Sequence, residues 1–325
     1  MRGCLSGIVA GLALGSIVCM SALSLLTPRY GWPIYLELFA HFQLQYLLIC
    51  LVLTGVLVFL GRRRTVWVAL FCCALVSAQI VPWYWPPGFL GRAADKANLR
   101  VLVANLNTQN TDYEKILAIA RAEQPDLAVF MEVDQPWVDQ LNTLSDILPY
   151  SSGQASPYHV GIMLYSRQPL VNPEINFFGT EINAAVVSQV NFNNQPLSVV
   201  AAHPPPPIKS PLFHTRNRQL DQIGQYLQTV ESPTLLLGDL NLTMWSPYYQ
   251  RLERQAGLRN ARKGFGIIPS WPTRGTYHQL PDWASLLFAM PIDHCLLSPS
   301  IHVTDVRTGA ETGSDHLPLI VDLRV

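Results

Sequence analysis

The sequence lacks the cysteine pattern of a disulfide-bonded protein or of a cysteine-held metal site. Six cysteines occur in 325 residues, and no two of them have CxxC spacing. Five fall in apolar N-terminal segments, so only Cys295 lies in the rest of the chain. Because Cys295 stands in an apolar run, we expect a buried thiol in a strand rather than a nucleophile. A disulfide framework is therefore excluded.

An excess of basic residues, the usual mark of nucleic-acid binding, is missing from most of the chain. Residues 98–325 hold fifteen Lys and Arg against twenty Asp and Glu, whereas residues 1–97 hold seven against two. Affinity for nucleic acid comes mainly from neutralising phosphates, so this acidic balance disfavours nucleic acid as a partner. The balance does not exclude a local basic groove. Internal repeats are also absent, and the length suits one large domain with an appendage.

Long apolar runs are present near the N-terminus. Residues 5–26, 44–61 and 65–85 are each long and apolar enough to cross a bilayer. A cleaved signal peptide is disfavoured, because no small-residue cleavage site follows the first run and two more runs do. We therefore expect residues 1–86 to form three transmembrane helices.

Charged and aromatic residues around these runs predict their orientation. The basic run Arg62–Arg64 separates the second and third spans, and the positive-inside rule places it in the cytoplasm. The third span then ends outside, where the aromatics Trp83–Trp85 suit the headgroup level. Glu37 and His41 fall outside the clear spans, so the spans are predicted to be an anchor rather than a transporter. We expect a protein of the inner (plasma) membrane with an extracytoplasmic domain.

After a linker over residues 87–98, strand-like and helical patterns follow one another to the C-terminus. Many strands with helices between them predict an α+β domain over residues 99–325, in which two packed mixed sheets are flanked by helices. The expected strands are 99–104, 126–131, 160–165, 170–178, 184–192, 197–202, 234–238, 292–297, 303–307 and 317–323, and the expected helices are 112–123, 135–147, 210–230 and 247–255.

Polar residues stand at the ends of several of these strands. Carboxylates, amides and imidazoles are the groups that hold a divalent cation and a phosphate, because hard cations take oxygen ligands. Each position also has an ordinary alternative, such as an Asx turn, a solvated loop acid or a capping histidine. The positions are Asn105-Leu106-Asn107, Glu132, His203, Gly238-Asp239-Leu240-Asn241, Asp293 and Gly313-Ser314-Asp315-His316.

Local chemistry adds information at three of them. Glu132 ends an apolar strand, where an unpaired buried charge would be costly, so it should lie at a rim or be paired. His203 titrates near neutral pH unaided and precedes four prolines that stiffen the next loop. Gly238 lets the backbone turn sharply before Asp239, which makes this motif more specific than an ordinary turn.

In this order the motifs resemble the endonuclease/exonuclease/phosphatase superfamily over residues 99–325. The resemblance implies a DNase I-like four-layer α/β sandwich and the hydrolysis of a phosphoric ester or anhydride with Mg²⁺ or Mn²⁺. It also implies that Asn105, Glu132 and Asp315 hold the metal. Catalytic roles are implied for His203, Asp239, Asn241, Asp293 and His316.

The resemblance assigns a step to each catalytic residue. Asp239 orients or deprotonates the attacking water, and Asn241 donates a hydrogen bond to a phosphate oxygen. His203 contacts the phosphate and protonates the leaving oxygen. Asp293 fixes the tautomer of His316, which acts as a base or a phosphate clamp.

Other residues are weaker candidates for substrate contacts. Asn107 stands where the family often has Asp, and Tyr158 lies beside a segment similar to a family strand near the substrate. Arg216 is a candidate for an anionic head group, against the alternative of a solvated helix face. Trp271 borders the pocket or packs, and His294 should point away from Asp293 by strand alternation and be structural.

The arrangement of three spans followed by one domain is also similar to the VanJ-type teicoplanin-resistance membrane proteins. This resemblance implies a phosphohydrolase of the outer membrane face that acts on a polyprenyl (undecaprenyl) diphosphate or another phosphorylated lipid. A membrane-tethered endonuclease or phosphodiesterase is the alternative enzyme, since the fold by itself does not decide the substrate. A catalytically inactive binding module is a further alternative, and it predicts a missing ligand.

Overall fold

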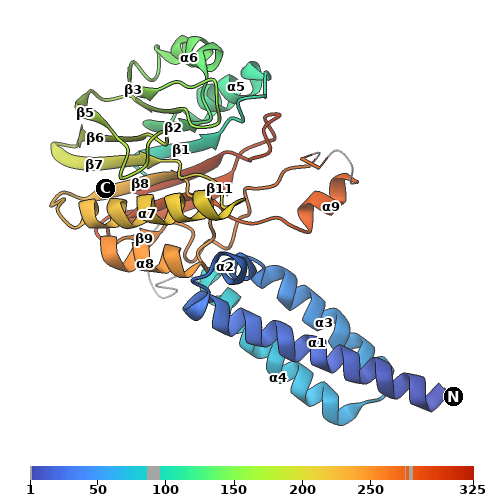
Figure 1. Ribbon diagram of the computed structural model, residues 1–325. Helices are drawn as coiled ribbons and strands as arrows, with labels where there is room; N and C mark the ends of the chain where they lie inside the picture. Colours follow the sequence, from blue (N-terminus) through green and yellow to red (C-terminus); the bar gives the residue numbers. More distant parts are fainter. Residues whose placement is uncertain (1, 86–95, 275, 278–280) are drawn as a thin grey trace.

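The computed structural model describes residues 2–85, 96–274, 276–277 and 281–325. Most of the linker predicted over residues 87–98 lies outside the described residues. Figure 1 shows a bundle of N-terminal helices that projects from one end of a sandwich of sheets and helices. The two parts are in contact, because Ser246 and Trp245 of the sandwich donate to the Glu37 carboxylate and to the backbone oxygen of Gln79 in the bundle.

The bundle consists of α1 (Arg2–Tyr30), α2 (Ile34–Ala40), α3 (Gln43–Phe59) and α4 (Arg63–Ile80). Two segments, Cys4–Tyr30 and Arg63–Trp83, are long and apolar enough to cross a membrane. The short α2 and α3 pass the same test together but are bent by 66° at their junction, so the described residues hold two or three candidate spans. The predicted second span is thus only the longer arm of a bent pair.

Two six-stranded mixed sheets form the centre of the rest of the chain. The first has the order β11-β12-β1-β2-β4-β3 and the second the order β5-β6-β7-β8-β10-β9. The first sheet comprises β11 (His302–Thr308), β12 (Leu319–Arg324), β1 (Leu99–Asn105), β2 (Leu127–Met131), β4 (Ile162–Ser166) and β3 (Tyr150–Gln154). The second comprises β5 (Leu170–Asn176), β6 (Ala185–Phe192), β7 (Gln195–Ala202), β8 (Thr234–Asp239), β10 (Asp293–Leu297) and β9 (Arg259–Asn260).

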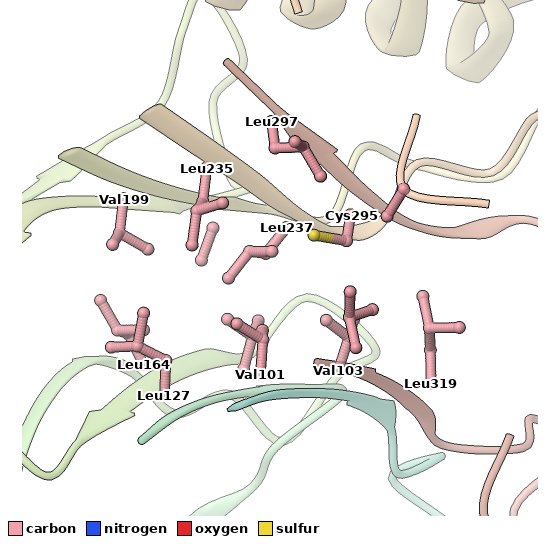
Figure 2. Packing of buried hydrophobic residues seen from close by; sticks show 14 of the residues in the cluster. Val101, Val103, Leu127, Leu164, Val199, Leu235, Leu237, Cys295, Leu297 and Leu319 are labelled. Atoms are coloured by element: carbon pink, nitrogen blue, oxygen red, sulfur yellow. The ribbon is translucent and has the colours of Figure 1, made fainter. Parts of the chain in front are cut away.

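Apolar side chains from the two sheets meet face to face and form the main core (Figure 2). Val101 and Val103 of β1 point toward Leu237 of β8 and Cys295 of β10, and all four are fully buried. Burial raises the pKa of the Cys295 thiol to about 12, so it stays protonated and packs as an apolar group. The prediction of a buried structural thiol is confirmed.

Helices cover the outer face of each sheet (Figure 1). The first sheet packs under α5 (Tyr113–Glu123) and α6 (Gln135–Leu141), and the second under α7 (Ser210–Leu227) and α8 (Pro247–Ala256). The order helices, sheet, sheet, helices confirms the predicted four-layer sandwich. The short α9 (Asp282–Leu286) stands apart from both sheets.

Four elements differ from the sequence predictions. The helix predicted over 135–147 ends at Leu141 and continues as a 3₁₀ turn, η2 (Asn142–Leu144). The edge strand β3 was not predicted, because its side chains are exposed or half-buried and show no apolar alternation. The two-residue β9 and the helix α9 are too short to give a periodic signal.

Strand direction brings the polar motifs to one edge of both sheets. β1 runs parallel to β2, and β7 runs parallel to β8, so Asn105, Glu132, His203 and Asp239 all come at the same ends of their strands. β12 and β10 run antiparallel to these strands and therefore begin at that edge. The topology alone thus gathers residues that are far apart in the chain.

Candidate active site

Asp239 and Asp293 lie opposite each other on neighbouring strands, β8 and β10. Both are fully buried, at 1% and 0% exposure. Gly238 precedes Asp239 with φ of 144°, and a Cβ at this position would stand 1.9 Å from the carbonyl oxygen of Ala202. Only glycine permits this close approach of β7 to β8, which also brings His203 beside Asp239.

Asp293 pairs with the imidazole of His316. His316 Nδ1 lies 2.8 Å from Asp293 Oδ2, and the backbone N–H of His316 donates to Ser314 Oγ. Ser314 Oγ donates in turn to the backbone oxygen of Asn105, which joins this loop to the end of β1. Asp293 therefore holds His316 in one orientation, with Nε2 free to face the centre of the site.

The charges around His316 keep it protonated. Burial lowers its pKa, but the carboxylates of Asp293 and Asp239 outweigh burial and raise the pKa to about 10. The imidazole of His316 is therefore a cation and a hydrogen-bond donor at neutral pH. This state suits the clamp on phosphate that the sequence analysis offered as one of two roles, rather than the base.

A second imidazole faces the same carboxylate. His203 Nε2 lies 3.6 Å from Asp239 Oδ2, and His316 Nε2 lies 3.7 Å from the same oxygen. Burial lowers the pKa of His203, yet its close contact with the Asp239 carboxylate and the charges of Asp239 and Glu132 raise it overall. The Asp239 carboxylate thus lies between two imidazoles that can both donate protons.

Glu132 completes the group from the end of β2. Asn105 Nδ2 donates to Glu132 Oε1 at 3.0 Å and to Asp239 Oδ2 at 3.2 Å, so one amide bridges the two carboxylates. Burial raises the pKa of Glu132, but His203, Asn105 and His159 together lower it, and the group is ionised. Its φ of 58° is left-handed, a conformation that turns the side chain off the strand end toward the site.

The donor set fits a hard divalent cation. Glu132 and Asp239 offer carboxylate oxygens that only one amide now joins, and Asp293 Oδ1 and His203 Nδ1 are buried polar atoms without a hydrogen-bond partner among the described residues. Oxygen-rich sites of this kind suit Mg²⁺ or Mn²⁺. Asn105 presents its NH₂ group to both carboxylates, so it differs from the predicted metal ligand unless its amide turns over.

One atom each of Asp239, Asp293 and His316 also lies within 4.8 Å of the others, which is compatible with a metal. We favour Glu132 and Asp239 instead. Asp293 Oδ2 and His316 Nδ1 already satisfy each other through a direct hydrogen bond, and hard cations prefer oxygen over imidazole nitrogen.

Asp315, also predicted as a metal ligand, lies at the rim in a different set of contacts. Its Oδ1 accepts from Asn107 Nδ2 at 3.0 Å and its Oδ2 accepts from Trp271 Nε1 at 3.1 Å. Both oxygens are therefore engaged away from the two carboxylates of the proposed cation site. The Trp271 ring centre lies 6.4 Å from that of His316, so Trp271 borders the site.

The contacts of Asn241 and of Arg216 both differ from the predicted contacts with substrate. Asn241 Nδ2 donates to the backbone oxygen of Pro204 at 2.9 Å, and its N–H donates to Asp239 Oδ1 at 2.8 Å. Arg216 was predicted to contact substrate from a helix surface, and this is corrected, because it is fully buried and lies 3.2 Å from Glu37 of α2. A buried, paired guanidinium cannot reach a head group in solvent.

Two other predictions concern histidine and its neighbours. Tyr158 is 74% exposed and extends into solvent, whereas the adjacent His159 contacts Glu132 through Nδ1. In the sequence His159 was only a weaker candidate, because it flanks the segment similar to a family strand near the substrate, and it was not among the assigned site residues. His294 is structural as predicted: its Nε2 lies 2.8 Å from the Leu242 oxygen, and burial lowers its pKa to about 3.

Sequence reasoning also missed Arg262. This residue is fully buried and its Nη1 contacts the backbone oxygen of Asp293. Burial lowers its pKa to about 10, against the opposing effect of Asp293. Arg262 follows a two-residue strand in an irregular segment, so no pattern in the sequence marked it.

Comparison with known proteins agrees with the fold. A sequence model of the Endonuclease/Exonuclease/phosphatase family matches residues 102–316, about two thirds of the chain. No curated protein matches the chain by sequence.

Several solved structures are similar in fold. D. rerio TDP2 complexed with a single-strand DNA product has a TM-score of 0.59 at 15% identity, covering 70% of this chain and 99% of that one. An AP endonuclease from Archaeoglobus fulgidus has a TM-score of 0.57 at 15% identity, covering 70% and 100%. Sphingomyelinase C from Streptomyces griseocarneus has a TM-score of 0.52 at 19% identity, covering 69% and 98%. At these identities the similarity establishes the fold.

Proposed function

Because the chain belongs to the Endonuclease/Exonuclease/phosphatase family, we propose that it is a membrane-anchored, divalent-metal-dependent hydrolase of a phosphorylated lipid. The preferred substrate is a polyprenyl diphosphate, with undecaprenyl diphosphate as the main candidate. The reaction takes place at the extracytoplasmic face of the inner membrane. The observation that supports a lipid is an apolar arm next to the site, formed by Trp271, Tyr277, Trp283, Leu287 and Phe288. This arm lies beside the N-terminal helices.

The arrangement of the site supports hydrolysis at phosphorus. Water attacks the terminal phosphorus, the bridging P–O bond breaks, and the polyprenyl phosphate leaves with inorganic phosphate as the second product. Asp239 orients the water and accepts its proton, while His203 protonates the leaving oxygen. His316, held as a cation by Asp293, donates to a non-bridging oxygen. A cation held by Glu132 and Asp239 would offset the charge that builds on the phosphate.

This apolar arm connects the rim of the site to the N-terminal helices. The ring centres of Trp271 and Tyr277 lie 6.4 Å apart, and those of Tyr277 and Phe288 lie 6.3 Å apart. Gln45 of α3 donates to the backbone oxygen of Leu287 at 3.0 Å, so the arm ends against a candidate membrane helix. A row of aromatic side chains between a candidate span and the site suits a substrate whose tail stays in the lipid.

Side chains at the end of the arm are exposed although they are apolar. Trp283 is 64% exposed and Leu287 is 52% exposed, next to a segment that could lie in a membrane. Exposed large apolar side chains beside candidate spans favour contact with lipid at the interface. A nuclease would instead need a basic surface here.

The direct test uses the detergent-solubilised full-length chain with Mg²⁺ and undecaprenyl diphosphate. We expect release of inorganic phosphate, and none from an Asp239→Asn variant. Plasmid DNA and sphingomyelin are tested beside it, because similar folds occur in a DNA-bound protein and a sphingomyelinase. Cleavage of plasmid DNA without phosphate release from the lipid would show the alternative function, a tethered nuclease.

The double substitution Trp283→Ser and Leu287→Ser tests the apolar arm. We expect kcat/KM for undecaprenyl diphosphate to fall by about 10–100-fold, because burying an aromatic or Leu side chain contributes about 1.5–3 kcal/mol. Hydrolysis of a short-chain, water-soluble prenyl diphosphate should stay unchanged. Tyr150→Ser, on the exposed edge strand β3, is the matched control and should affect neither substrate. Equal losses on both substrates would contradict a role in lipid access.

A further inference from the structure

The loop that follows Asp239 rests on the N-terminal helices. Ser246 Oγ donates to Glu37 Oε1 at 2.6 Å, and the N–H of Thr243 donates to His41 Nδ1 at 3.3 Å. Trp245 Nε1 donates to the backbone oxygen of Gln79 in α4 at 3.0 Å. Residues 240–246 include the candidate catalytic Asn241. Three other residues of this loop are thus hydrogen-bonded to the N-terminal part: one to α2, one to His41 directly after α2, and one to α4.

Arg216 connects Glu37 to Asn241 directly. Its Nη2 lies 3.2 Å from Glu37 Oε1, and its Nη1 donates to the backbone oxygen of Asn241 at 2.9 Å. Both charged side chains are fully buried, at 0% exposure. Two buried charges of opposite sign hold each other in place, since each would be strongly disfavoured alone.

Asn241 has a left-handed backbone conformation that such contacts can hold in place. Its φ is 54°, in the left-handed region, which a residue other than glycine adopts at some cost. In this conformation its N–H reaches Asp239 Oδ1 and its side chain reaches Pro204. The Arg216 guanidinium donates to the Asn241 carbonyl oxygen, so the N–H, the side chain and the carbonyl of Asn241 are all held by hydrogen bonds.

We propose that Glu37 is a positioning residue of the active site: by holding Arg216 on the carbonyl of Asn241, the N-terminal helix α2 sets the geometry of the catalytic loop. The N-terminal helices are then part of the catalytic unit and more than an anchor. The catalytic readout of this inference rests on the proposed hydrolase activity. The contact from Glu37 to the loop is independent of it.

Adhesion between the two parts has a separate source. Val76 and Ile80 of α4 lie in one buried apolar cluster with Leu242 and Met244 of the loop. Buried ion pairs add little net stability compared with apolar groups of similar size. The cluster therefore holds the parts together, and the ion pair decides where the Asn241 backbone lies.

The test compares Glu37→Gln with the wild-type full-length chain in detergent. We expect kcat for a short-chain, water-soluble prenyl diphosphate with Mg²⁺ to fall by about 10–100-fold, as a small displacement of a catalytic group does. The Mg²⁺ concentration for half-maximal activity should not change, because Glu37 does not touch the proposed cation site. Glu37→Asp, which keeps the charge, should recover part of the rate.

Tyr248→Phe is the matched control at the same interface. Tyr248 Oη donates to the backbone oxygen of Trp32, so this variant also removes one hydrogen bond between the two parts. It leaves Asn241 and the ion pair in place, and its kcat should equal that of the wild type. An equal loss in Tyr248→Phe and Glu37→Gln would overturn the proposal.

Hydrogen exchange measures the loop without any need for activity. In Glu37→Gln the amides of residues 240–243 should exchange faster, while those of β1 and β2 stay as protected as in the wild type. Faster exchange across the whole sandwich, or no change in the loop, would overturn the proposal. If the wild type released no phosphate from a prenyl diphosphate but loop amides exchanged faster in Glu37→Gln, the proposed function would be rejected and the positioning role would be kept.

A double variant covers the case in which Glu37→Gln fails to fold. Glu37→Gln with Arg216→Gln removes both charges, so no unpaired charge remains buried. We expect this variant to fold and to keep the low kcat, because the guanidinium on Asn241 is lost. Wild-type kcat in the folded double variant would overturn the proposal.

Discussion

Replacing His316 by asparagine is expected to lower kcat for undecaprenyl diphosphate by about 10³-fold, within the range that a positioned proton donor contributes. The imidazolium faces Asp239 at 3.7 Å and is oriented by Asp293, so its loss removes a donor to the phosphate. Asparagine keeps a polar group of similar reach but cannot carry the charge. The measurement is phosphate release at saturating Mg²⁺.

His214→Asn is the matched control for this prediction. His214 is exposed on α7 and packs its ring against Phe213, so the same substitution there should leave kcat unchanged. Circular dichroism should give the same helix and strand content for both variants. An His316→Asn enzyme with wild-type kcat would remove His316 from the reaction and would revive the inactive binding module as an alternative.

Removal of divalent metal is expected to abolish the activity, and Mg²⁺ or Mn²⁺ should restore it. The physical reason is the cluster of Glu132 and Asp239, whose two carboxylates are joined only by the Asn105 amide. A bound cation should also raise the melting temperature, because it stabilises the folded chain by about 2.7 kcal/mol at a cation concentration 100 times its Kd. Thermal unfolding with and without EDTA thus gives a readout that does not depend on substrate.

Two variants of acidic residues then separate the candidate ligands. Glu132→Gln should raise the Mg²⁺ concentration for half-maximal stabilisation by about 100-fold, the upper part of the range for residues that support a metal. Asp315→Asn should change it much less, because Asp315 is engaged by Asn107 and Trp271. Equal shifts in both variants would favour the original assignment of Asp315 as a ligand.

Strand ends and their polar residues could be predicted from local patterns. The run Leu235–Leu237 followed by Gly238 and Asp239 reads as a buried strand that stops at a polar site, and the structure places β8 there. The same holds for Glu132 after β2 and His203 after β7. Hydrophobic periodicity and turn chemistry are local properties, so they are visible in the chain itself.

The partners of these residues were less predictable. Asn105 was assigned to the metal, but its amide bridges two carboxylates, one of them 134 positions along the chain. Arg216 follows a helical pattern in which an arginine normally faces solvent, and only the packing of α2 against α7 and the loop makes it buried. No spacing in the sequence relates it to Glu37.

The sequence by itself determined the kinds of layer, the apolar N-terminal helices and the chemical identity of the site residues, because these follow from periodicity and side-chain type. Only the tertiary structure decided which groups meet. Asp239 faces His203 because β7 and β8 are neighbours, and it faces His316 because the loop before β12 reaches the same edge. Arg216 contacts both Glu37 and Asn241 because α2 docks beside the loop. Contacts between distant segments arise from packing in three dimensions, which no local pattern encodes.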